Sequence, residues 1–424
     1  MKGRWSGLLT NLMVLMMASL LVMGFGPAQG EKDEIKIGVL CPLTGKIAAY
    51  GQEQKNAVEM AIEEINATGG IFGAKLVMQL EDDEMKPELA ASMTQKLIND
   101  GVDVIIGGMS SSSTMAGGPI ANSKEVLMIS PWSTNPLAAE GEWVFRACFS
   151  DEFQGAIQAK YMVENLGCKR PAQLLDVSDD GSKGQGEVVA TTLEELGAPL
   201  ITVESYGAGD RDFKAQLTKI KSMDPDCLDT PNYYGEVALI RVQMKELGLD
   251  IPHIGGDGVD SADFFKIAGD DAAGMMITTH YSPEDPRPVV QEFRKKYEEK
   301  YGKVPDSTAA LSYDAVMLYK MAVEKAWSFD KYAVRDALAG LQNVTTLVTA
   351  PSFSMDETGT GIKSLAIVEA GTDGGWHFRD VVNPPQAEGA AEDSEPPTGK
   401  DEIKIGVLCP LTGKIAAYGQ EQKN

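Results

Sequence analysis

The sequence predicts an α/β protein of two lobes, each built on a doubly wound parallel sheet. Short apolar runs alternate with amphipathic stretches along most of the 424-residue chain, and this alternation is typical of parallel strands covered by helices on both faces. The alternation restarts after Asp151. About 390 residues follow the first 30, which is more than one ordinary hydrophobic core holds, so two lobes are expected.

The first lobe begins with the run IKIGVL at residues 35–40, a β-rich strand that ends before Pro42. A helix is expected next, because apolar side chains recur at helical spacing until two glycines end it at residues 69–70. Pro87 opens the following helix. Further apolar runs predict three more strands, at residues 74–80, 103–108 and 126–130.

The second lobe repeats the pattern with five predicted strands. They occupy residues 172–177, 200–205, 227–230, 253–257 and 274–279. Helices are expected around them, at about 153–165, 185–195, 212–222 and 235–247. A last strand at 364–370 is preceded by three helices, at 289–301, 307–327 and about 331–339.

Residues 1–30 have the order of an export signal. Lys2 and Arg4 precede an uncharged apolar run from Leu8 to Phe25, and small residues follow it. This order predicts a cleaved signal peptide and therefore a periplasmic or extracellular protein. A permanent N-terminal membrane anchor is the alternative, since the run approaches spanning length. The small residues that follow the apolar run favour cleavage.

The end of the chain repeats the segment that follows the signal peptide. Residues 384–399 are mostly Pro, Glu, Gly and Ala, which predicts a solvated acidic linker. Residues 400–424 then copy residues 32–56 at all 25 positions. The copy stops before the apolar helix face that would let it pack, so a mobile tail on a monomer is expected. The alternative is that residues 402–408 compete for the place of the first strand, in the same chain or in a domain-swapped dimer.

The composition excludes several kinds of partner. The net charge of −24, or −26 without the leader, argues against binding to nucleic acid or anionic lipid. The five cysteines lack the spacing of a zinc site or disulfide knot, so one bridge or none is expected. The acidic run at 81–84 is better explained as a strand-end cap than as a cation site, because no second acidic cluster accompanies it. No metal or cofactor is expected.

Candidate binding loops follow the predicted strands. In parallel α/β sheets, ligands bind beyond the carboxyl ends of the strands, where helix N-termini offer free N–H groups. The serine-rich loop GGMSSSSTMAGG at 107–118 leads into a helix, so its hydroxyl and amide groups suit a carboxylate. Plain N-capping explains these serines equally well. The other loops at this position are residues 41–51, 130–136 and 255–264.

An exported α/β enzyme is a second hypothesis, and the motifs weigh against it. The sequence has no G-x-S-x-G elbow, no Walker A loop and no G-x-G-x-x-G after a strand. Its three histidines, His253, His280 and His377, are scattered. Nothing in the sequence nominates a catalytic pair.

Several motifs, in a fixed order, resemble one known family. They are PLTGKIAAYGQEQKNAVEMAIEEINATGGIFGAKL, VIIGGMSSSSTMA, VLMISPWSTNP and VFRACFSDEFQG. Over about residues 33–382 the chain resembles the periplasmic leucine/isoleucine/valine-binding proteins, the substrate-binding subunits of branched-chain amino acid ABC transporters. The resemblance implies a type I periplasmic binding protein fold, in which two lobes joined by a three-segment hinge close on a ligand. It implies that lobe one is 33–150 and 281–354, and that lobe two is 151–280 and 355–383.

The resemblance also implies roles for individual residues. Ser111 corresponds to the residue whose hydroxyl holds the ligand α-carboxylate, and Thr134 to a threonine that binds through backbone and side chain. Asp257 corresponds to an acid that pairs with the α-ammonium, and Tyr50 to an aromatic residue lining the cleft. A zwitterion needs donors at one end and an anion at the other, and both contacts strengthen when a closing cleft excludes water.

Four further residues are candidate ligand contacts. Trp132 lies where the backbone contacts ligand in the family, and the adjacent Ser133 is a candidate as well. Asp151 lies near the expected crossover between the lobes. A structural role in the hinge and a direct contact with the ligand are equally good interpretations of this residue. Tyr233 and its neighbour Tyr234 follow a lobe-two strand, and one is expected to line the cleft while the other packs.

Two departures from the family pattern bear on the ligand. Lys183 lies about where relatives commonly carry a tyrosine; a solvent-facing side chain is expected, and a pocket-facing one would favour an extra carboxylate on the ligand. Trp132 replaces a usually small residue, either as a platform for a large apolar side chain or as a packing residue. Branched-chain selectivity is therefore left open.

The expected function is that of an exported, non-enzymatic substrate-binding protein. It would capture an amino acid, with branched-chain or other apolar ones favoured, and deliver it to the membrane permease of an ABC transporter. A soluble sensor that hands its ligand to a receptor is the alternative.

Overall fold

The computed structural model describes residues 32–207 and 209–384. The predicted signal peptide, the linker beyond Pro384 and the duplicated segment lie outside the described residues. Strand β1 (Glu34–Cys41) is an inner strand of its sheet, with a neighbour on each side, which explains why it is apolar on both faces. Ile37 and Val39 pack into the core on one side of this sheet, and Leu40 packs on the other.

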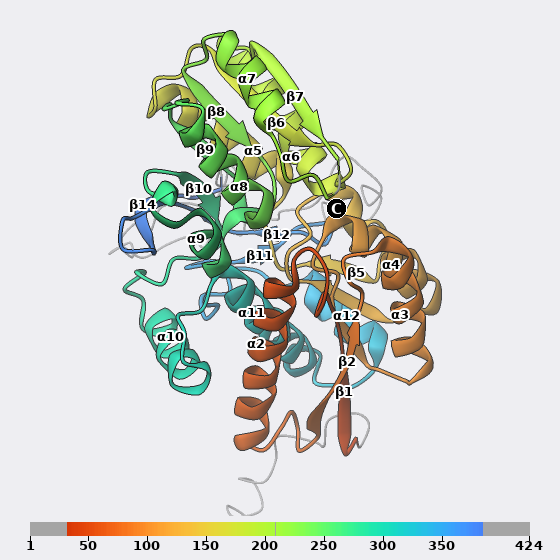
Figure 1. The fold of residues 1–424 in the computed structure, drawn as a ribbon. Helices are drawn as coiled ribbons and strands as arrows, with labels where there is room; N and C mark the ends of the chain where they lie inside the picture. The colour runs from red at the N-terminus through yellow and green to blue at the C-terminus, as the bar shows by residue number, and fades with distance from the viewer. Residues whose placement is uncertain (1–31, 208, 385–424) are drawn as a thin grey trace, which may run out of the picture. The chain divides into compact units, whose positions relative to one another are not determined.

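The first sheet has five parallel strands in the order β2-β1-β3-β4-β5. Its remaining strands are β2 (Lys75–Asp82), β3 (Val104–Gly107), β4 (Leu127–Ser130) and β5 (Val144–Arg146). Helices α2 and α11 cover one face, and α3 and α4 cover the other (Figure 1). The elements around this sheet are α2 (Ala48–Ala67), α3 (Pro87–Asn99), α4 (Ser111–Lys124), the 3-10 turn η1 (Pro136–Ala139), α10 (Pro288–Tyr301), α11 (Ser307–Ala326) and α12 (Lys331–Ala339).

The second sheet has seven strands in the order β14-β13-β10-β9-β8-β6-β7. They are β6 (Pro171–Asp176), β7 (Thr202–Tyr206), β8 (Cys227–Thr230), β9 (His253–Gly255), β10 (Met276–Thr279), β13 (Leu365–Ala370) and β14 (Trp376–Val382). Helices α5 and α6 pack on one face, and α7 and α8 on the other. The surrounding elements are α5 (Asp151–Glu164), α6 (Asp180–Glu195), α7 (Lys214–Ser222), α8 (Tyr234–Glu246), η2 (Asp257–Val259), α9 (Ala262–Ala268) and η3 (Gly269–Ala272).

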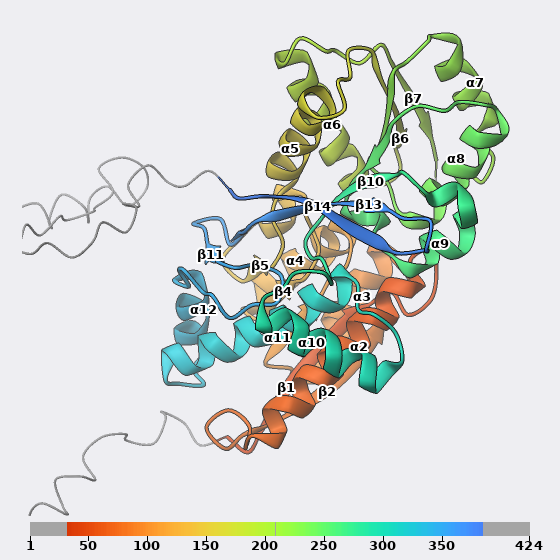
Figure 2. The same cartoon turned by 90° about the vertical axis from the view of Figure 1, so that its left-hand side faces the viewer.

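Two strands of the second sheet run against the others. β13 pairs antiparallel with β10, and β14 pairs antiparallel with β13; both are blue beside the green β10 in Figure 2. Five residues join β13 to β14, and so short a connection permits only an antiparallel pair. The prediction of two α/β lobes with parallel sheets is confirmed, with these two strands as an antiparallel addition at one edge.

The described chain passes between the two sheets three times. The crossings follow β5, β10 and β12 (Gly361–Ile362), which pairs with β11 (Ser354–Met355) in a small separate ribbon. The three-segment connection expected from the family resemblance is therefore present. We call the elements around the first sheet lobe one and the elements around the second sheet lobe two. The exact residue boundaries of the lobes stay a prediction.

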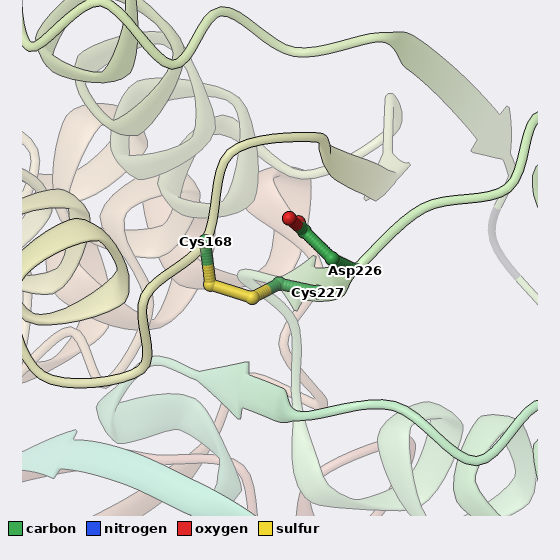
Figure 3. Close-up of side chains that lie close together, drawn as sticks. All are labelled: Cys168, Asp226 and Cys227. Atoms are coloured by element: carbon green, nitrogen blue, oxygen red, sulfur yellow. A yellow bond between two sulfur atoms is a disulfide. The ribbon is translucent and has the colours of Figure 1, made fainter.

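One disulfide joins the amino ends of two neighbouring strands in lobe two. Cys168 precedes β6 and Cys227 begins β8, and the bond connects residues 59 apart in sequence (Figure 3). The sequence left open one bridge or none, and the described residues contain this one. Cys41 and Cys148 are free thiols in the interior.

Candidate ligand-binding site

A polar cavity of about 30 Å³ lies where loops of the two lobes meet. One water molecule needs roughly 10–15 Å³, so this void has room for about two or three water molecules. Lobe one contributes the loops after β3 and β4, and lobe two those after β6, β8 and β9. All five loops follow the carboxyl ends of strands, as the strand-end argument predicted.

The serine-rich loop brings a helix N-terminus to this cavity. Ser110 caps α4 by accepting a hydrogen bond from Ser113 N at 3.1 Å. Ser111, the first residue of α4, lines the cavity, and its hydroxyl accepts a hydrogen bond from Asn135 N at 3.3 Å. The turn before the helix needs glycine, because Gly108 has φ +77° and a Cβ there would collide with the Thr114 hydroxyl. Ser110 therefore caps the helix, and its neighbour Ser111 lines the cavity.

The loop after β4 places Trp132 and Thr134 at the cavity, but not Ser133. The Ser133 hydroxyl is buried and donates to the carbonyl oxygens of Gly108 and Ser110, at 2.9 Å and 3.0 Å. Ser133 therefore holds the two lobe-one loops together. This arrangement does not favour the predicted contact between its side chain and a ligand.

Asp257 lines the cavity from lobe two and is held by two buried neighbours. Gln154 Nε2 donates to Oδ1 at 3.0 Å, and His280 Nε2 lies 2.9 Å from Oδ2. Burial lowers the pKa of His280 to about 4. The ring is therefore neutral at pH 7 and carries its proton on Nε2, because a carboxylate only accepts hydrogen bonds. A neutral donor orients Asp257 while leaving its negative charge available to a cationic group.

The aromatic residues divide into lining and packing residues. Tyr50, expected to line the cleft, lies behind Trp132, with ring centroids 5.1 Å apart. Its hydroxyl donates to Gly258 O at 2.6 Å, so it joins lobe one to the loop that carries Asp257. Tyr233 lines the cavity, whereas Tyr234 packs edge-on against Tyr50. As expected from the sequence, one of the two neighbouring tyrosines therefore lines the cavity and the other packs.

Asp151 does not line the cavity and begins helix α5. Its side chain is buried, and neither carboxyl oxygen has a hydrogen-bond partner among the described residues. Burial raises the pKa of Asp151 to about 8. Its backbone N–H donates to Thr134 O at 2.9 Å. Of its two interpretations, a role at the crossover fits this position; direct ligand contact stays a prediction.

Lobe two also supplies an acid that the sequence analysis missed. Asp179 lines the cavity and caps α6 by accepting from Ser182 N at 2.8 Å. Burial raises its pKa above the ordinary value. Lys183 does not line the cavity: its ammonium pairs with Asp180 at 2.6 Å, and its side chain is 40% exposed. The solvent-facing alternative for Lys183 is therefore the one observed. The SDDG motif at residues 178–181, which comes shortly after a strand, is the sequence feature that could have identified Asp179 as a site residue.

One side-chain cluster has the composition of a metal site without its chemistry. Cys168, Asp226 and Cys227 bring three potential ligand atoms within 4.8 Å of one another. Figure 3 shows the two sulfur atoms joined in the disulfide, so neither is a thiolate. The Asp226 carboxylate accepts hydrogen bonds from the backbone N–H groups of Lys169 and Arg170. These contacts explain the cluster as a structural junction.

Two α/β sheets linked by three crossings, with a polar cavity between the carboxyl ends of their strands, define the class of type I periplasmic binding proteins. The family model described as periplasmic binding protein matches residues 34–375, and the chain belongs to that family. The family resemblance seen in the sequence is thereby confirmed. Within the part of the chain that the structure describes, no helix is both long and apolar enough to cross a membrane.

Several binding proteins are similar to this chain over most of their length. The leucine-, isoleucine-, valine-, threonine-, and alanine-binding protein of Pseudomonas aeruginosa is 33% identical over 327 residues, which cover 76% of this chain and 86% of that protein. The solved structure of the leucine binding protein LivK from Thermotoga maritima has a TM-score of 0.78 and 35% identity, covering 83% of this chain and 100% of that one. The branched-chain amino acid transporter substrate binding protein LivJ from Streptococcus pneumoniae, solved with isoleucine, has a TM-score of 0.77 and 30% identity, with coverage of 83% and 100%.

Proposed function

We propose that this protein is the exported substrate-binding subunit of an ABC transporter. It captures an amino acid between its lobes, with branched-chain or other apolar amino acids favoured, and delivers it to a membrane permease. The observation that carries the proposal is one cavity lined by Ser111 and Thr134 from lobe one and by Asp257 from lobe two. The relatives are named as binding proteins for leucine, isoleucine and valine, which supports the ligand class.

The predicted contacts follow the charges of a zwitterion. The α-carboxylate would accept hydrogen bonds from the Ser111 and Thr134 hydroxyls and from free N–H groups at the start of α4. The α-ammonium would pair with Asp257, which His280 and Gln154 already orient. Binding from both lobes makes ligand capture favour the closed form, since only that form offers both sets of contacts.

Trp132 is the proposed wall for the ligand side chain. It lines the cavity, its ring stacks on Tyr50, and it meets His280 edge-on at a centroid distance of 5.7 Å. These contacts hold the indole in one orientation. A fixed apolar surface favours apolar ligand side chains, which supports the platform interpretation over a purely packing one.

The remaining parts of the function are extensions of the same proposal. The signal-like residues 1–30 support export, and the transporter named for LivJ supports delivery to a permease. The protein itself would carry out no chemistry, because ATP hydrolysis belongs to other subunits of an ABC transporter. The predicted state is a monomer.

A thermal-shift screen of the ligand-stripped protein tests the function directly. Leucine, isoleucine and valine should raise the melting temperature, and a ligand at about one hundred times its dissociation constant should add roughly 2.7 kcal/mol of stability. Succinate and glucose serve as negative controls, since neither has an α-ammonium group. Stabilisation by none of the twenty amino acids would contradict the proposal.

A further inference from the structure

Lys46 reaches from lobe one into lobe two, next to the candidate site. It lies in the loop between β1 and α2, and its ammonium is 2.8 Å from Oδ2 of Asp176 and 3.2 Å from Oε1 of Glu236. Asp176 ends β6, and Glu236 lies in the first turn of α8. In the described residues, no other lysine or arginine forms an ion pair between an element of lobe one and an element of lobe two. Lys46 is therefore a cation that bridges the two lobes.

The burial and charge of the partners make this contact more than a surface ion pair. The Asp176 side chain is 1% exposed and that of Glu236 10%, while that of Lys46 is 25% exposed. Burial alone would lower the pKa of Lys46, but Glu236 and Asp176 raise it above its ordinary value. Burial would also raise the pKa of Asp176, yet its bonds to Lys46 and Ser178 lower it. Lys46 and Asp176 are thus both held in their charged forms.

The acceptor in lobe two is held in position by its own lobe. Asp176 Oδ1 accepts from Ser178 N at 2.9 Å, and Asp176 N donates to Asn232 Oδ1 at 3.1 Å. Opening the lobes would leave this oriented, buried carboxylate without its cation, which is unfavourable. The Lys46 ammonium also lies 5.2 Å from the ring centre of Tyr233, which lines the cavity. The ion pair therefore lies directly beside the cavity wall.

We infer that Lys46 is an interlobe latch, a positioning residue that holds the closed form through Asp176 and Glu236 and thereby slows ligand release. This inference rests on the proposed function, since release is meaningful only if the cleft binds a ligand. Lys46 does not line the cavity. It acts on the ligand through the position of lobe two and not by direct contact.

The test compares Lys46→Met with a matched control. Met keeps most of the aliphatic stem and removes the charge. Lys219→Met removes a lysine–carboxylate ion pair that lies on the surface and wholly within lobe two, between Lys219 and Glu204 at 2.6 Å. Stopped-flow binding of leucine and isoleucine should give a dissociation rate raised roughly tenfold or more in Lys46→Met, with an association rate changed less than about threefold. Lys219→Met should match the wild type in both rates.

Two further measurements separate an interlobe latch from an ion pair with only a local effect. In a double-mutant cycle with Glu236→Gln, the second substitution should have little additional effect once Lys46 is Met. Small-angle X-ray scattering of the ligand-free protein should show a larger radius of gyration for Lys46→Met than for the wild type and for Lys219→Met. Unchanged dissociation rates and an unchanged radius of gyration would overturn the inference. If no amino acid binds the wild type, the proposed function fails, and the scattering comparison still decides whether Lys46 holds the lobes closed.

Discussion

The Nε2 atom of His280 lies 2.9 Å from Oδ2 of Asp257, and both side chains are buried. The ring of Phe149 stacks on the imidazole at a centroid distance of 3.6 Å. Phe149 and His280 lie on two different crossings of the chain. The acid proposed to hold the ligand ammonium is therefore positioned by the same segments that connect the lobes.

Replacing Asp257 should abolish tight binding. Asp257→Ala leaves the ligand ammonium desolvated and unpaired, and we expect amino acid affinity to fall by about 2–5 kcal/mol in isothermal titration calorimetry. Asp263→Ala is the matched control, because Asp263 is a lobe-two acid whose ion pair with Lys266 lies on the surface and away from the cavity. An Asp257→Ala affinity within a few-fold of the wild type would remove Asp257 from the site.

Acid should destabilise the protein through His280. The unfolded chain takes up a proton here near the ordinary pKa of 6.5, whereas the folded protein does so only at about 4. The unfolded state binds more protons in this window, so the contribution of His280 to stability is complete above pH 6.5 and is lost as the pH falls to about 4. Urea unfolding should show a loss from this group of up to about 1.4 kcal/mol per pH unit. In His280→Gln this part of the pH dependence should disappear; an unchanged slope would contradict a neutral, buried imidazole.

Asp151 should have the opposite dependence on pH. Burial raises its folded pKa from 3.8 to about 8, so the folded state binds more protons between these values and stability falls as the pH rises through them. Asp151→Asn keeps the shape and carries no charge. The variant should be more stable than the wild type at pH 8.5, and the difference should shrink as the pH falls towards 4. Thermal unfolding at pH 5 and pH 8.5 measures this, and a variant that is less stable at pH 8.5 would show that the carboxylate has a stabilising partner.

The disulfide should contribute to stability and not to binding. It closes a loop between residues 59 apart in sequence, for which the chain-entropy relation gives about 4 kcal/mol. The paired substitution of Cys168→Ala with Cys227→Ala should lower the free energy of unfolding by that order. Amino acid affinity should stay within about twofold, because the bond lies at the amino ends of β6 and β8 and the cavity lies at their carboxyl ends. A large loss of affinity in the folded variant would contradict this separation.

The site residues that directly follow predicted strands could be identified from the local sequence. Ser111 and Thr134 follow parallel strands, and Asp257 follows β9, so the ends of those strands fix their place. Gln154 and His280 were missed because their partner Asp257 is 103 and 23 residues away in sequence, and no local pattern marks such a pair. His280 does follow β10 directly, and the same reasoning applied to that strand would have nominated it.

Side-chain direction was the part that sequence alone predicted least well. Tyr50 and Ser133 lie in the expected loops, but Tyr50 packs behind Trp132 and Ser133 bonds back to the serine loop. These directions depend on neighbours contributed by other elements. Strand β14 was not predicted because most of its residues are polar or exposed, as suits an edge strand. Strand β5 was not predicted because it is only three residues long.

Calorimetry with leucine and two truncated analogues tests whether the cleft binds both charged ends of an amino acid. Leucine methyl ester lacks the carboxylate that Ser111 and Thr134 would hold, and 4-methylpentanoic acid lacks the ammonium that Asp257 would hold. We expect leucine to bind and each analogue to bind at least about a hundredfold more weakly, since each analogue leaves one buried set of polar groups unpaired. Binding of either analogue as tightly as leucine would contradict the proposal that the site binds both the carboxylate and the ammonium of a zwitterion.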